Sequence, residues 1–84
     1  MPTTKETYSK AMDLAEEAFL AQKKGCYFSA YWRFKKSLKL VEDAIYKIPE
    51  NDTYETTKYI LNLSAKSIAN NIAINRRKMC DGLR

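Results

Sequence analysis

The chain has no histidine among its 84 residues, and this absence narrows the chemistry open to it. General acid–base catalysis and the activation of nucleophiles most often use histidine. The only glycines, Gly25 and Gly82, are too far apart to build a glycine-rich phosphate loop or a nucleophile elbow. We therefore expect a protein that is not an enzyme, with no catalytic residues and no cofactor.

Cysteine is almost as scarce, since only Cys26 and Cys80 occur and they do not form a Cys-x-x-Cys pair. Without histidine, a zinc site would have to combine two thiols with carboxylates, a ligand set that zinc proteins rarely use. The sequence therefore predicts no metal site.

Long apolar runs are also missing. No stretch of about 18 apolar residues occurs, and the N-terminal "MPTTKETYSK" lacks the apolar core of a signal peptide. These absences predict a soluble, cytoplasmic protein. In a reducing compartment, Cys26 and Cys80 are expected to remain free thiols.

Few residues interrupt the chain, and Pro2, Gly25, Pro49 and Gly82 divide it into three long segments. We predict helices over residues 4–24, 26–48 and 53–80. Short connections make neighbouring helices antiparallel, so the expected fold is all-α, an up-down-up three-helix bundle forming one domain over residues 1–84. The third helix is the longest, and its last turns are expected to overhang the bundle.

Apolar residues recur at steps of three and four positions in each predicted helix, which places them on one face. The first helix carries Tyr8, Ala11, Met12, Ala15, Ala18 and Phe19; the second carries Tyr27, Ala30, Tyr31, Phe34, Leu38, Val41, Ile45 and Ile48; the third carries Tyr54, Leu61, Ala65, Ile68, Ile72 and Met79. These stripes predict the core.

The third helix has a second apolar stripe, roughly opposite the first, made of Ile60, Leu63, Ser67 and Ile74. Apolar anchors at such spacings are typical of a helix that packs into a partner's groove or forms one. Self-association and burial within the chain are the alternatives that the sequence leaves open. This stripe is the strongest candidate for a binding surface.

Aromatic residues and cations are mixed in the predicted second helix. Phe28 and Trp32 lie four positions apart, off the main stripe, with Lys35, Lys36 and Lys39 following them. Such a strip can stack nucleic-acid bases or receive an acidic helix. We expect Phe28 to join the core, since a middle helix touches both neighbours and needs a wide apolar face; Trp32 remains open between core and surface.

The net charge of +5 allows an acidic partner, and the excess of cations lies in the second and third predicted helices. Arg76, Arg77 and Lys78 form a basic patch that suits a microtubule or an anionic membrane. Cations in a last helical turn also stabilise the helix dipole, which is the alternative role of this patch.

Residues 11–41, "AMDLAEEAFLAQKKGCYFSAYWRFKKSLKLV", contain a recurrent pattern of small, aromatic and leucine positions. The positions are Ala11, Leu14, Ala18, Gly25, Tyr27, Ala30, Phe34 and Leu38. This pattern resembles the first two helices of MIT domains, the microtubule-interacting and trafficking modules. Several positions also suit a tetratricopeptide-type hairpin, but such arrays usually need about three repeats of roughly 34 residues, so the length favours the MIT resemblance.

The resemblance implies that the third helix lines a groove for short tail segments of ESCRT-III proteins. The nearest counterpart of the family's Tyr-Leu-Asp-Arg-Ala-Glu-like run is "ILNLSAKSI", residues 60–68, with Ala65 as the best match. No Asp or Glu lies between Glu55 and Asp81, so the acidic contact that many members offer a basic tail is missing. The expected partner segment is therefore acidic.

We thus predict a non-catalytic adaptor that docks a short, acidic, helical or extended segment of an ESCRT-III-like or trafficking partner along the third helix. The residues expected to contact it are Ile60, Leu61, Leu63, Ser67, Ile74, Trp32, Lys35, Lys39 and Lys66. The alternatives are a small basic helical protein that binds nucleic acid through Trp32 and the cations, and a self-associating structural bundle.

Overall fold

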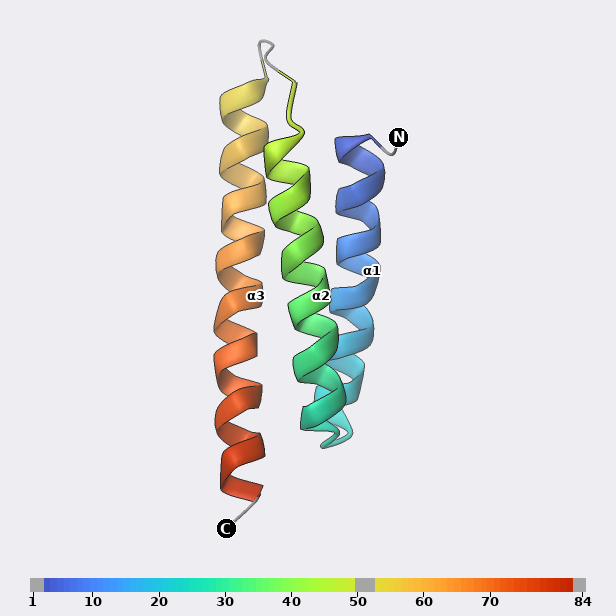
Figure 1. The fold of residues 1–84 in the computed structure, drawn as a ribbon, viewed down its shortest axis with the longest axis vertical. Coiled ribbons are helices and arrows are strands. Elements are labelled where there is room, and N and C mark those ends of the chain that lie inside the picture. The colour runs from blue at the N-terminus through green and yellow to red at the C-terminus, as the bar shows by residue number, and fades with distance from the viewer. Residues whose placement is uncertain (1–2, 50–52, 83–84) are drawn as a thin grey trace.

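The computed structural model describes residues 3–49 and 53–82. It contains α1 (Thr4–Lys23), α2 (Tyr27–Tyr46) and α3 (Tyr54–Gly82), which run side by side in alternating directions (Figure 1). The predicted all-α, antiparallel three-helix bundle is confirmed, and each predicted helix end lies within two residues of the observed one.

The turn between α1 and α2 depends on Gly25. Its φ angle is 82°, in the left-handed region that favours glycine, and the amide N–H of Cys26 donates to the carbonyl of Ala21 at 2.9 Å. At the other end of α1, the Thr3 side chain accepts a hydrogen bond of 3.1 Å from the backbone N–H of Glu6, which caps the helix N-terminus. These local signals fix the bounds of α1.

Small residues line the contact between α1 and α2. Every buried apolar residue of α1 is an alanine, and α2 contributes two more; the set is Ala11, Ala15, Ala18, Ala21, Ala30 and Ala44. The buried hydroxyl of Ser37 donates to the carbonyl of Ala11 at 2.6 Å, a bond that requires the two backbones to lie close together. The two helices are therefore held at short range by residues without long side chains.

The larger core side chains come from α2 and α3. Phe34 and Val41 are entirely buried, and Leu61 and Ile68 are nearly so. Helix α2 packs against both neighbours, whereas α1 and α3 are joined by two side-chain hydrogen bonds, one between the Tyr8 hydroxyl and Ser64 Oγ (2.9 Å) and one from Asn75 Nδ2 to Gln22 Oε1 (2.8 Å). Helices α1 and α3 thus both pack on the buried side of α2 and touch each other through polar side chains.

Helix α3 is longer than the other two, with 29 residues against 20 in each of α1 and α2. Its C-terminal end extends past the α1–α2 turn, as predicted (Figure 1). None of the helices in the described parts of the chain is long and apolar enough to cross a membrane.

Candidate partner-binding surfaces

The second apolar stripe of α3 lies at the surface. Ile60, Leu63 and Ile74 are each 49% exposed, and Ser67 is exposed beside them. We call these four residues the α3 face. They project away from Leu61 and Ile68, which are buried. Within the described residues, burial inside the chain is therefore not the role of this stripe.

Leu61 was predicted both in the core stripe and among the partner contacts; the structure confirms the first prediction and corrects the second. It is only 3% exposed and lies in the core with Ile68. One position along a helix turns a side chain by about 100°, so Leu61 is turned inward where its neighbour Ile60 is turned outward. Leu61 contributes to the surface only as part of the wall of a hollow.

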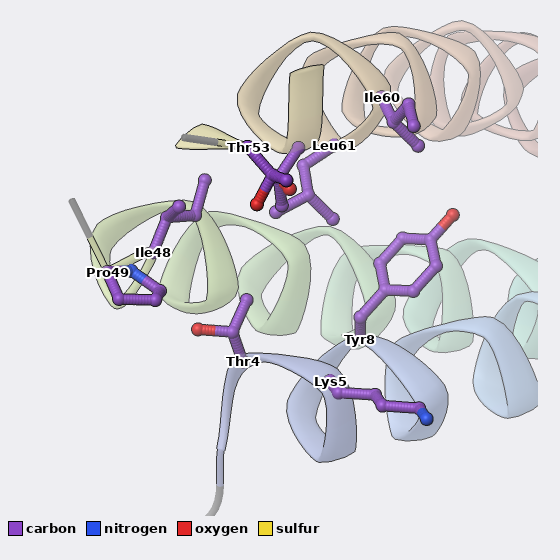
Figure 2. A pocket seen from close by; sticks show the side chains of 9 residues that line it. Thr4, Lys5, Tyr8, Ile48, Pro49, Thr53, Ile60 and Leu61 are labelled. Atoms are coloured by element: carbon purple, nitrogen blue, oxygen red, sulfur yellow. The ribbon is translucent and has the colours of Figure 1, made fainter. Parts of the chain in front are cut away.

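That hollow lies where α1, α3 and the end of α2 meet, and its volume is about 300 Å³. Figure 2 shows Ile60 and Leu61 on α3 facing Tyr8 on α1, with Ile48 and Pro49 following α2; Lys5 of α1 also borders the hollow. The sequence does not reveal this hollow, because its residues come together only when the three helices are packed. It joins one end of the α3 face to α1.

The α2 residues of the predicted site lie on a different side of the bundle. The core residues Ala30, Phe34 and Val41 point from α2 towards its two neighbours. Trp32, Lys35 and Lys39 are exposed on the outward side of the same helix, and Trp32 is 48% exposed. Lys39 borders a hollow that it shares with Leu14 of α1. Ile60 borders a different hollow, the one between α1 and α3, so the two residues lie on different sides of the bundle.

The predicted contact residues are thus divided between two surfaces rather than gathered in one site. We call Phe28, Trp32, Lys35 and Lys39 the α2 face. Lys66 is exposed on α3, three positions after Leu63, and places a cation beside the α3 face. A partner that follows the α3 face is therefore not expected to touch Trp32.

Phe28 is 66% exposed, so the expectation that it joins the core is wrong. The reason is the alanine-rich packing of α1 on α2: close approach of the two backbones requires only a narrow stripe of α2, which Ala30, Phe34 and Ser37 already supply. Trp32, left open by the sequence, is half exposed beside it.

The rings of the α2 face, Phe28 and Trp32, form a cluster with the neighbouring Tyr31. Phe28 and Tyr31 each make an edge contact with Trp32, with centroid distances of 6.2 and 5.4 Å. The ammonium of Lys35 lies 5.5 Å from the centroid of Trp32 and 5.3 Å from that of Tyr31. These distances are typical of cation–π contacts, so Lys35 covers part of the aromatic surface.

The basic patch surrounds the end of α3. Arg76 and Arg77 line a hollow with Ile72 and Cys80, whereas Lys78 borders another hollow with Phe28 of α2. Consecutive residues on a helix point in different directions, which spreads the three cations around its circumference. Lys78 therefore connects the basic patch to the α2 face.

Both cysteines are exposed and unbonded. No group of three or more cysteine, aspartate, glutamate or histidine side chains in the described residues is arranged to hold a metal ion.

No protein-family model, curated protein or solved structure matches this chain. The resemblance to MIT domains therefore rests on the pattern in residues 11–41.

Proposed function

We propose that this chain is a non-catalytic adaptor module, similar to an MIT domain, that docks a short acidic segment of an ESCRT-III-like or other trafficking partner on the α3 face. The observation that carries the proposal is the half exposure of Ile60, Leu63 and Ile74 on one side of a long helix. Exposed apolar side chains grouped in this way are typical of interaction sites, and their spacing suits an amphipathic segment.

Charge supports an acidic segment. Helix α3 has no acidic residue between Glu55 and Asp81, and Lys66 and Lys78 are exposed along this length. A basic tail would meet only like charge here, which is unfavourable, whereas aspartate and glutamate side chains beside the apolar anchors would be attracted.

The hollow between α1 and α3 supplies an anchoring point. Tyr8, Ile48 and Ile60 give it a mostly apolar lining, and Lys5 stands at its rim. A volume of about 300 Å³ suits one or two apolar side chains of the docked segment. Recruitment of the chain to endosomal or other membranes would follow from the location of the partner, a part of the proposal that rests on the resemblance.

The test is a comparison of wild type, Leu63→Asp and Asn62→Asp as affinity baits. Asn62 is exposed one position away from Leu63, so its variant carries the same added charge off the α3 face. A segment retained by wild type and Asn62→Asp but lost by Leu63→Asp, with helicity unchanged in circular dichroism, is the expected result. The segment is then synthesised with its acids replaced by lysine, and this version should not bind in fluorescence polarisation.

Two outcomes would contradict the proposal. Collapse of the helical signal in Leu63→Asp would show that this face is needed for folding. A solution mass that rises with concentration in wild type and returns to the monomer value in Leu63→Asp would show that the face pairs two copies of the chain.

A further inference from the structure

Charge is unevenly distributed along the molecule, which measures 50 × 20 × 16 Å. One end is formed by the α1–α2 turn and the last turns of α3 (Figure 1). The cations at this end, which we call the basic end, are Lys23, Lys24, Arg33, Arg76, Arg77 and Lys78, and the acids bordering its hollows are Glu17 and Asp81. At the opposite end, Lys5, Lys47 and Lys58 are balanced by Glu6, Asp43 and Glu55.

Large apolar side chains are exposed at the same end. Phe28 is 66%, Leu20 53% and Trp32 48% exposed. Phe28 lines a hollow of about 650 Å³ together with Lys78, and Leu20 lines another with Lys24 and Arg33. Cations are therefore exposed on all three helices at the basic end, and large apolar side chains are exposed beside them on α1 and α2.

The arrangement of the rings distinguishes between anionic partners. Stacking of nucleic-acid bases needs open aromatic faces. Here Lys35 lies over the rings of Tyr31 and Trp32, and Trp32 is also in T-shaped contact with the rings of Phe28 and Tyr31. Leu20 has no ring and cannot stack. A lipid interface, in contrast, accepts exposed aliphatic and aromatic side chains beside cations.

We propose that the basic end docks on an anionic lipid bilayer. The cations contact the lipid phosphates and carboxylates, while Phe28 and Leu20 enter the headgroup region. A lysine or arginine near an anionic membrane surface strengthens binding by about fivefold. Because the contact is at one end of an elongated bundle, Ile60 and Leu63 of the α3 face, near its other end, stay accessible, and the membrane contact does not depend on the proposed partner.

The test uses the full chain and sucrose-loaded vesicles of phosphatidylcholine, with and without phosphatidylserine, in a sedimentation assay. We expect binding to the mixed vesicles that weakens as salt is added, and little binding to phosphatidylcholine alone. Trp32 is the only tryptophan, so a blue shift of its emission and quenching by lipids brominated in the acyl chains report insertion next to Phe28.

Matched variants locate the contact. Replacing Arg76, Arg77 and Lys78 together with alanine should weaken binding by about 100-fold, and Phe28→Ala by about tenfold. Replacing Lys5, Lys47 and Lys58 with alanine removes the same charge from the opposite end and should leave binding close to that of wild type. Leu63→Asp should also bind the vesicles, which separates this test from that of the α3 face.

Three results would overturn the inference. One is equal binding to vesicles with and without phosphatidylserine. A second is an equal loss of vesicle binding in the two triple variants, which would mean that binding depends on the net charge of the protein and not on the position of the cations. The third is tight binding of a single-stranded oligothymidylate, at a salt concentration where vesicles do not bind, since the ligand of this end would then be nucleic acid.

Discussion

The side-chain amide of Asn75 donates a hydrogen bond of 2.8 Å to Gln22 Oε1, and this polar pair joins α3 to α1 at the basic end of the bundle. Asn75 is entirely buried and also donates to the carbonyl of Asn71 at 2.7 Å, whereas its Oδ1 has no partner among the described residues. It lies seven positions after Ile68 and fourteen after Leu61, so a polar residue occupies a position in the apolar stripe of α3. A buried asparagine in such a stripe can specify the register of neighbouring helices.

We predict that Asn75→Ala lowers the free energy of unfolding by about 2 kcal/mol, because it opens a cavity and removes the partner of Gln22. Gln22→Ala should cost about 1 kcal/mol, and the double variant should cost less than the sum, since the two side chains share one bond. Urea unfolding measures all three. Asn62→Ala, at an exposed position of the same helix, is the control and should change stability by less than about 0.5 kcal/mol. Additive losses would mean that the pair does not couple the helices.

Asn75 also shows what the sequence could not provide. A polar residue does not count towards an apolar stripe, although Asn75 lies seven residues after Ile68 and fourteen after Leu61 in the sequence. The helices themselves were predictable, because Thr3 caps α1, Gly25 ends it and the stripes of α2 and α3 have helical spacing. These signals are local, and the structure confirms them.

The positions of the surfaces relative to one another were not predictable. Whether Trp32 and Ile60 share a face depends on how each helix is rotated about its axis, and an apolar stripe fixes that rotation only approximately. The exposure of Phe28 was missed for the same reason, since it follows from the close, alanine-rich contact of α1 with α2. The fold could be predicted from the pattern of single helices, whereas the site needed the packing between them.

Ser37 tests the closeness of that contact. Ser37→Ala should lower the free energy of unfolding by about 1 kcal/mol, through loss of the bond to the Ala11 carbonyl. Ser37→Leu should cost about 3 kcal/mol or more, because the added side chain has no space between the two backbones. Thermal and urea unfolding compare the two, with Ser9→Ala on the exposed side of α1 as the control. A leucine variant as stable as the alanine variant would show that α1 and α2 can separate at little cost.

Gly25 offers a test of the turn alone. A Cβ at position 25 would have no described atom of another residue within 4 Å, so a larger residue would not clash with its neighbours. A substitution there therefore tests only the energy of the left-handed backbone conformation. With φ at 82°, Gly25→Ala should lower the free energy of unfolding by about 1 to 2 kcal/mol. Gly25→Asn should cost less, since asparagine tolerates the left-handed region better. Equal stability of the glycine and alanine forms in urea would contradict the left-handed turn.

Trp32 reports directly on the α2 face of the free protein. Because Trp32 is half exposed, with Lys35 over its ring, we expect emission at long wavelength and strong quenching by iodide, which the nearby cations attract. Caesium, a cationic quencher, should be much less effective for the same electrostatic reason.

Lys35→Ala should raise the exposure of the ring, so quenching by neutral acrylamide increases while the preference for iodide over caesium decreases. Tyr46→Ala, at a 92% exposed position on the same helix, should change neither the quenching by acrylamide nor the preference for iodide over caesium. Equal quenching of wild type by iodide and caesium would show that the cations of α2 do not govern the electrostatic potential around Trp32.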